Sequence, residues 1–391
     1  MKYRAKLLQS AQAIRASYWF IPATMVLFTF ALANLAIWMD RSTDMLPFQL
    51  PRVLANTQIE GARSTLTTIA TSVIGVTGVM FSMTVVAVSF AAGNYGPRLI
   101  GNFMRDRGNQ ISLGILISTF VYALFILRVV QNPVDEGGIA AFVPQYSLLL
   151  AVIGCIVAVF TMIYFVHHVP ETINVSNITA NLGRRLERDI KALIDADAEH
   201  ETPDDEGFPE TDPDRQICLP DTGYIQVLRY HRIKELSDKE SCRIKVLQYP
   251  GDFVTRFTPV LGIWGAETLD DEEISQLQEC FAVGTSRTEH QNIFFLVDQL
   301  VEMLARALSP GVNDPFTAIN CLNWMHNGLK TAQHHAGGLP DVGARSFELG
   351  PCLTFDKLFA RSFEASRPYC EPDHLVMARY KELADDVKAG R

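Results

Sequence analysis

The chain has 391 residues, enough for two or three domains, and carries a formal net charge of −9. This acidic balance argues against nucleic acid as a partner, because nucleic-acid binding needs a basic face. The seven cysteines include no C-x-x-C pair, which excludes a zinc ribbon, and their odd number does not fit a disulfide framework. They indicate free thiols in a reducing compartment.

Four long apolar runs predict a transmembrane domain over residues 1–170. Each run reaches the roughly 20 residues that a helix needs to cross the hydrocarbon core, and none keeps the polar face of a soluble helix. The first run follows a basic N-terminus, as a signal peptide would. It is long and three more spans follow, so we expect a retained anchor helix. The predicted spans are residues 18–39, 66–93, 111–130 and 146–166.

Lys and Arg residues near the ends of the spans predict the orientation of the chain. They cluster in the N-terminal tail, between the second and third spans, and after the fourth span, whereas residues 131–145 carry only acidic charges. Cytoplasmic loops are enriched in Lys and Arg. Both termini and residues 170–391 are therefore predicted to be cytoplasmic.

The second span is dense in small residues. Small side chains let helix backbones approach closely. The seven-residue interval from position 75 to 82 to 89 keeps one seam of the helix facing a partner or an axis. Two interpretations stay open: the seam packs against another helix, or it lines a pore in a homo-oligomer. The candidate seam residues are Gly75, Gly78, Ser82, Ser89 and Gly93.

Residues 171–194 predict an amphipathic juxtamembrane helix. Apolar residues recur every four positions at 178, 182, 186 and 190, the spacing of one helix face. Basic residues lie off this stripe and are candidate contacts for anionic lipid headgroups or a neighbouring subunit. These residues are Arg184, Arg185 and Arg188.

Residues 195–216 are acidic and contain prolines, which predicts a solvated, disordered loop. Residues 217–266 then predict a small β section, with two strands joined at the turn 250–252. The stretch GDFVTRFTPV resembles the turn and strand of lipoyl/biotinyl-like barrel sandwiches. Phe257 stands where that pattern has glycine, and no hairpin with a carrier lysine is evident. The resemblance implies a barrel-like packing module without a prosthetic group.

Residues 267–391 predict a helical cytoplasmic section, so the expected fold class is a membrane domain followed by an α+β domain. Its most unusual stretch is ALSPGVNDPFTA. Asp followed by Pro is the N-cap and first-turn signature of a helix start, while Pro-Gly closes a preceding helix, with the glycine at positive φ. We interpret the stretch as an elbow between helices rather than a catalytic loop. The elbow residues are Pro310, Gly311, Asp314 and Pro315.

Two long blocks of the sequence resemble a bacterial family of predicted membrane proteins of unknown function. The blocks are VAVSFAAGNYGPRLIGNFMRDRGNQISLGILISTFVYALFILR and QLVEMLARALSPGVNDPFTAINCL. The resemblance extends over almost the whole chain. It implies an integral protein of the bacterial inner membrane with a cytoplasmic C-terminal domain, and it implies no particular reaction.

The sequence lacks the motifs G-x-G-x-x-G, G-x-x-x-x-G-K-[ST], H-E-x-x-H and G-x-S-x-G, which mark nucleotide-binding and hydrolytic sites. His167 and His168 are interpreted as a helix-end pair rather than a metal site. No span has a charge near its centre, which argues against a proton-coupled pump. We expect no catalytic residue, cofactor or metal, and therefore no enzyme.

Two functions of different classes fit these features. The first is a homo-oligomeric channel, whose second span lines the path for an ion or small molecule and whose cytoplasmic domain gates it. The alternative is a membrane-anchored scaffold or ligand sensor without transport. Both place the protein in a lipid bilayer, and an oligomer with a continuous axial opening would favour the first.

Overall fold

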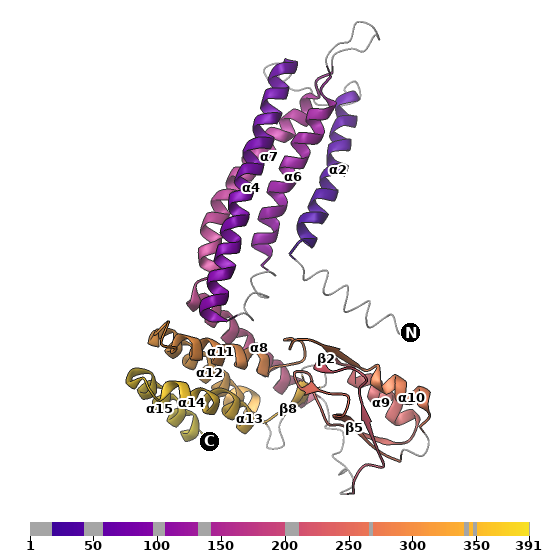
Figure 1. The fold of residues 1–391 in the computed structure, drawn as a ribbon, viewed down its shortest axis with the longest axis vertical. Coiled ribbons are helices and arrows are strands. Elements are labelled where there is room, and N and C mark those ends of the chain that lie inside the picture. Colours follow the sequence, from indigo (N-terminus) through magenta and orange to yellow (C-terminus); the bar gives the residue numbers. More distant parts are fainter. Residues whose placement is uncertain are drawn as a thin grey trace. The chain divides into compact units, whose positions relative to one another are not determined.

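The computed structural model describes two compact units of the chain (Figure 1). The membrane unit contains the described residues between 18 and 174 except 94–96, which belong with Val175–Arg391 to the C-terminal unit. The described residues are 18–42, 58–96, 106–131, 142–199, 211–265, 269–339, 344–346 and 350–390.

Four helices form the membrane unit: α2 (Phe20–Arg41), α4 (Ile59–Tyr95), α6 (Arg107–Val129) and α7 (Gln145–Thr172). All four are long and apolar enough to cross a membrane, and each contains most of one of the four predicted apolar runs. α4 is longer than predicted, at 37 residues, because the helix begins at Ile59, in turns with charged and hydroxyl side chains that precede the apolar run.

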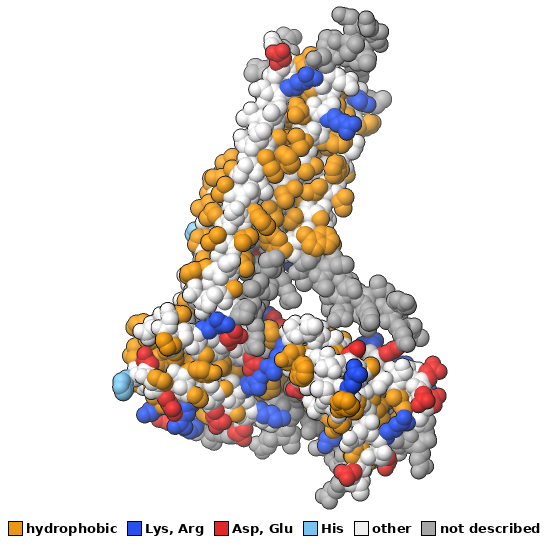
Figure 2. Space-filling model, in the orientation of Figure 1, with side chains coloured by type: hydrophobic (Ala, Val, Ile, Leu, Met, Phe, Trp, Pro, Cys, Tyr) orange, Lys and Arg blue, Asp and Glu red, His pale blue; other side chains and the backbone are white. Residues whose placement is uncertain are grey.

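The membrane unit is apolar both inside and outside. The backbones of α2, α6 and α7 approach one another closely, and α4 packs onto them through one apolar stripe that includes Leu66 and Met80. Large apolar side chains also cover the outer surface (Figure 2), where Phe28, Val86 and Phe160 are 67–69% exposed. A surface of this kind is unfavourable in water, at about 25 cal/mol per Å² of apolar area, and suits a lipid environment.

A buried carboxylate at the end of α2 caps the start of α7. Asp40 accepts hydrogen bonds from the backbone nitrogens of Tyr146 and Ser147, at 2.8 and 3.0 Å, and from the Ser147 hydroxyl at 2.6 Å. The residue at the N-cap position of α7, Pro144, makes no side-chain capping bond. Asp40 therefore satisfies N–H groups that a helix start otherwise leaves without partners.

The C-terminal unit contains a helical layer centred on α12 (Pro315–His334). Around it pack α8 (Val175–Glu199), α11 (Phe294–Ala307) and α15 (His374–Ala389). The apolar stripe predicted for α8 lies in this layer, and its leucines at 182 and 186 are buried. The shorter helices α13 (Phe355–Phe359) and α14 (Ala365–Cys370) flank a π-helical turn at Ala360–Glu364.

Two three-stranded antiparallel sheets complete the C-terminal unit, and a single apolar core lies between them and the helices α9 (Tyr230–Lys239) and α10 (Asp271–Gln278). One sheet has the order β1 (Arg215–Cys218), β5 (Pro259–Trp264), β3 (Arg243–Val246). The other has the order β4 (Phe253–Val254), β2 (Gly223–Leu228), β6 (Phe281–Gly284). A separate hairpin pairs β7 (Ala344–Ser346) with β8 (Gly350–Leu353).

Several predictions for this unit need correction. No strand pairing joins the two sheets into a closed barrel among the described residues, so the barrel-like prediction is not confirmed. The turn at 250–252 connects strands of different sheets. β6 and the β7–β8 hairpin interrupt the section predicted to be helical, because short apolar runs do not distinguish strand from helix. α8 continues to Glu199, into the predicted acidic loop, and residues 200–210 lie outside the described residues.

Candidate functional site

The residues predicted as a seam all lie on the outward side of α4. On the opposite side, the helix buries Leu66, Val73, Met80 and Ala87 at seven-residue intervals. A Cβ added to any of the three seam glycines would meet no neighbouring atom of the described residues within 4 Å. The three glycines of the seam are therefore not packed against another helix of their own unit. Its exposed members are Gly75, Gly78, Ser82, Ser89 and Gly93.

The outward face of α4 carries a longer pattern than the sequence prediction recognised. Small residues recur at alternating intervals of four and three, which is the 3.5-residue repeat of helices that pack along a seam. Val85 interrupts the run of smaller side chains, and Gly93 flanks its end. We call this set the α4 seam. It comprises Ser64, Thr68, Thr71, Gly75, Gly78, Ser82, Val85, Ser89 and Ala92, all exposed except the half-buried Ala92.

An apolar groove of about 800 Å³ follows the middle of the α4 seam. Its α4 wall includes Gly75, Gly78 and Ser82, and its other wall is the end of α7 at Val169 and Pro170. The sequence prediction missed the α7 wall. A signal for it existed, because a proline near the end of a span removes a backbone donor and marks an irregular helix end.

Two of the hydroxyl groups on this face bond within the helix. The Ser82 hydroxyl donates to the Gly78 carbonyl at 3.0 Å, and the Thr71 hydroxyl donates to the Thr67 carbonyl at 2.8 Å. In helices, Ser and Thr hydroxyls often donate a hydrogen bond to the backbone carbonyl four residues earlier. The α4 seam is thus compatible with an apolar partner, while each hydroxyl oxygen can still accept a further hydrogen bond.

The histidine pair at the end of α7 has protein partners. A ring nitrogen of His168 lies 3.0 Å from the Asp106 carboxylate, and its ring stacks on Tyr164 with centroids 4.9 Å apart. His167 lies 3.4 Å from Glu171 in an exposed pair. Asp106 also caps α6 by accepting from the backbone nitrogen of residue 109. These contacts give the pair a structural role at the helix ends.

The three arginines predicted to contact lipid headgroups also lie beside protein groups. Arg185 pairs with Glu289, the Arg184 guanidinium lies 6.0 Å from the centroid of the Trp324 ring, and Arg188 bonds to its neighbour Asp189 at 2.9 Å. Among the side chains of the two ion pairs, that of Arg188 is the most exposed, at 68%. A headgroup contact by these arginines remains a prediction.

The stretch between α11 and α12 is an elbow built by capping. Asp314 accepts a hydrogen bond from the backbone nitrogen of Thr317 at 3.1 Å, and Pro315 is the first residue of α12. Asn313 adopts the positive φ of 49° that was predicted for Gly311. Asparagine tolerates this left-handed region better than most residues, so the glycine is not needed there.

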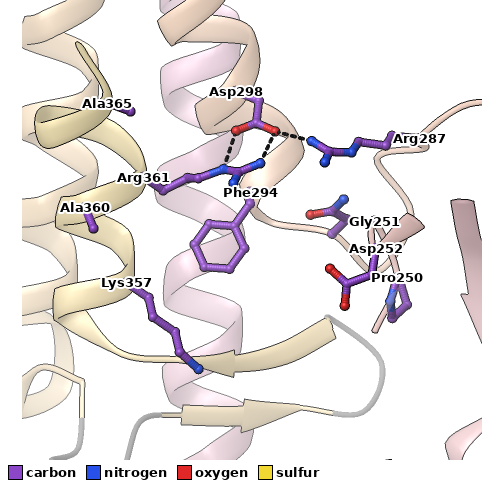
Figure 3. Close-up of a pocket in the computed structure, with 11 residues that line it drawn as sticks. Pro250, Gly251, Asp252, Arg287, Phe294, Asp298, Lys357, Ala360, Arg361 and Ala365 are labelled. Atoms are coloured by element: carbon purple, nitrogen blue, oxygen red, sulfur yellow. Dashed lines mark hydrogen bonds and ion pairs between the residues drawn. The ribbon is translucent and has the colours of Figure 1, made fainter. Parts of the chain in front are cut away.

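A charged cleft that sequence patterns did not indicate lies in the C-terminal unit (Figure 3). At its centre, the carboxylate of Asp298 on α11 accepts from two arginines. Arg361 donates through Nε at 2.6 Å and Nη2 at 2.8 Å, and Arg287 donates through Nη1 at 2.9 Å. Bidentate arginine–carboxylate pairs fix both partners in orientation.

Comparison with known proteins assigns almost the whole chain to one family. The family described as "Predicted membrane protein (DUF2254)" matches residues 15–386. The chain belongs to this family. The resemblance predicted from the two sequence blocks is confirmed, and with it the assignment as a membrane protein.

Relatives of this DUF2254 protein occur in mycobacteria. Uncharacterized proteins of Mycobacterium bovis and Mycobacterium tuberculosis are each 29% identical over 314 residues, which is 77% of this chain and 58% of the relative. The chain therefore spans less than two thirds of the length of these relatives. No solved structure matches the chain.

Proposed function

We propose that the protein assembles through the α4 seam into a homo-oligomeric channel of the bacterial inner membrane, with α4 lining the path and the C-terminal unit as its gating domain. The observation that carries the proposal is the outward direction of a small-residue seam that repeats every 3.5 residues. Within one chain, a Cβ added to Gly75 or Gly78 of the seam would meet no described atom within 4 Å.

Another copy of α4 suits this seam better than lipid does. A glycine in a helix is less favourable than alanine by about 1 kcal/mol, and lipid chains provide no compensating close contact. A second helix does, because small residues let two backbones approach until van der Waals contacts and interhelical hydrogen bonds form. The neighbouring outward positions, such as Val79 and Val86, carry the larger side chains of an ordinary lipid-facing surface.

The chemistry of the seam favours a narrow, uncharged path. It presents glycine, hydroxyl groups and the small apolar side chains of Val85 and Ala92, and no ionised side chain. Such a path selects by size and by the ease of wetting an apolar constriction rather than by charge. The expected cargo is therefore a small ion or solute that passes with little charge discrimination.

The experiment compares oligomeric state and flux for three proteins. Gly75→Leu adds bulk in the α4 seam, whereas Ile74→Phe adds bulk to an exposed position on the flank of the same helix. We expect the wild type and Ile74→Phe to form one oligomer and to conduct in liposomes. Gly75→Leu is expected to lower assembly or to block flux in an intact oligomer.

Water accessibility separates a pore from simple packing. Cysteines placed at positions 75, 82 and 89, after replacement of the native cysteines, should react with aqueous thiol reagents in the assembled protein. Ser82→Asp should raise leak by easing hydration of the constriction. A monomeric wild type, or an oligomer without flux and with three unreactive cysteines, would contradict the channel.

The second candidate is a membrane-anchored ligand sensor without transport. The charged cleft favours it, because an open, partly apolar site with a few fixed charges is typical of small-molecule binding. Ligand binding in a protein that never conducts would support this candidate over the channel.

A further inference from the structure

The charged cleft of the C-terminal unit is a built cavity rather than a surface ion pair. It has a volume of about 570 Å³, within the range of small-molecule sites. Three segments far apart in the sequence supply its walls: the turn Pro250–Asp252, the loop before α11 together with the start of α11, and the helical turns around residue 360. Figure 3 shows Asp298 between Arg361 and Arg287, with the Phe294 ring beside Arg361.

The cleft has an excess of positive charge. Arg287, Arg361 and Lys357 line it together with two carboxylates, Asp252 and Asp298. Asp298 is only 14% exposed and is held by both arginines. The oxygen Oδ2 of Asp252 accepts from the backbone nitrogen of Tyr249 at 2.9 Å. An anion that enters the cleft therefore meets two arginines whose shared carboxylate partner, Asp298, is already held in place.

Both arginines retain donors after pairing with Asp298. Arginine has five N–H groups, and the bonds to Asp298 use two nitrogens of Arg361 and one of Arg287. The Nε of Arg287 is buried without a partner among the described residues. Its guanidinium also lies 5.4 Å from the centroid of the Tyr224 ring, which holds it in place.

The backbone around the cleft is irregular in a way that creates space. Arg361 lies in the π-helical turn Ala360–Glu364, and such turns occur frequently at functional sites. The lining residues Ala360 and Ala365 are small. Gly251 has φ of 102°, and a Cβ there would lie 2.2 Å from the Asn292 amide. The turn that carries Asp252 therefore depends on glycine.

We propose that this cleft binds a small phosphorylated ligand that carries a planar ring, with a nucleoside monophosphate as the simplest member of the class. The phosphate lies against Arg287, Arg361 and Lys357. The ring packs on Phe294, and Asp252 accepts a hydrogen bond from a sugar hydroxyl. Arginine suits the phosphate because its planar fork matches the phosphate oxygens. The proposal concerns binding alone and does not depend on the α4 channel.

The test uses the full chain in nanodiscs of neutral lipid, with binding measured by calorimetry. The probes are adenosine monophosphate, adenosine, ribose 5-phosphate and inorganic phosphate. We expect adenosine monophosphate to bind at least about tenfold more tightly than the other three probes, because each lacks at least one of the proposed contacts. Equal binding of inorganic phosphate and adenosine monophosphate would overturn the assigned ligand class.

Three variants connect the binding to the cleft. Arg361→Gln should weaken adenosine monophosphate binding by roughly tenfold to a hundredfold, the usual consequence of losing charge-assisted hydrogen bonds. Ala360→Leu fills the cleft and leaves the ion pairs of Asp298 intact, so it should weaken binding without a change in thermal stability. Arg367→Gln is the matched control, since that exposed arginine pairs with Glu371 outside the cleft.

The proposal fails if the wild type does not bind adenosine monophosphate. It also fails if Arg361→Gln and Ala360→Leu both bind as the wild type does. Flux through the wild-type protein in liposomes, measured in parallel, tests the channel proposal separately. None of these variants changes a residue of the membrane unit.

Discussion

The two units of the protein place their polar interactions differently. In the C-terminal unit, three helices begin at their own capping residue, Asp270 for α10, Asp314 for α12 and Asp373 for α15, whereas α9 and α11 have no side-chain cap. In the membrane unit, α6 begins at its own cap, Asp106, whereas α2 has no side-chain cap and α7 depends on Asp40, which lies more than 100 residues earlier in the sequence. Where water is scarce, a polar group must find a partner elsewhere in the fold. Where water is present, water can also satisfy the first backbone N–H groups of a helix.

The largest expected effect comes from removing the long-range cap of α7 at Asp40. Asp40→Ala should destabilise the membrane unit by about 3–5 kcal/mol, because it leaves two backbone donors and the Ser147 hydroxyl without their charged acceptor. Asp40→Asn should lose less, since an amide oxygen still accepts. Unfolding of the purified protein in a lipid environment measures both. Glu60→Gln, at an exposed position in the first turn of α4, is the control and should be close to neutral.

An Asp40→Ala variant as stable as Glu60→Gln would contradict the long-range cap. The contacts of α7 would then come from the apolar packing of the unit, and Asp40 would be only an exchangeable polar residue at a helix end.

A glycine pair sharpens the comparison inside the C-terminal unit. A Cβ on Gly183 of α8 would lie 2.3 Å from Cε3 of Trp324, whereas a Cβ on Gly311 in the elbow would meet no described atom within 4 Å. Gly183→Ala should therefore destabilise the unit by about 1–3 kcal/mol through overpacking. Gly311→Ala should be neutral or slightly stabilising, because its φ is not positive.

Thermal unfolding of the two variants, followed by circular dichroism, gives the result. Equal stability of Gly183→Ala and Gly311→Ala would mean that α8 and α12 separate easily. The buried leucines of α8 would then not hold the two helices at a fixed distance.

The sequence predicted those parts of the molecule whose signals are local. Apolar runs predicted all four membrane helices, and Asp314-Pro315 predicted the start of α12. The seven-residue repeat from Gly75 to Ser89 was visible in the sequence, and extending it by intervals of three and four would have revealed the whole α4 seam. Which side of α4 faces outward required the packing of the other three helices.

The charged cleft could not be predicted in the same way. Asp298 lies in an apolar helix, and its partners Arg287 and Arg361 are 11 and 63 residues away in the sequence. No spacing rule connects residues across a loop, a helix and a π-helical turn. The absence of nucleotide motifs from the sequence excluded particular loops, and it did not exclude a cleft assembled from separate elements.

The smallest expected effect concerns Glu187 of α8, which is ion-paired on its own helix and hydrogen-bonded to α12. Glu187 accepts from Lys191 at 2.6 Å on its own helix and from the side-chain amide of Asn327 on α12 at 2.9 Å. The bond from Lys191, followed by the bond from Asn327, lowers the pKa of Glu187 below its ordinary value. A carboxyl group whose pKa is lowered by folding stabilises the fold fully above its unfolded pKa, and this contribution is lost as the pH falls through the folded pKa.

Glu187→Gln should therefore lower stability by less than about 1 kcal/mol at pH 7, because the pair is partly exposed and screened. The difference from the wild type should shrink as the pH falls below the ordinary range of a glutamate. Thermal unfolding at pH 7 and at acidic pH, for both proteins, measures this. Lys239→Gln serves as the control for general charge effects. It removes the charge of an exposed side chain on α9. A Glu187→Gln deficit that stays constant over the whole pH range would show that the side chain acts by packing on α12, and that the contact between α8 and α12 is not electrostatic.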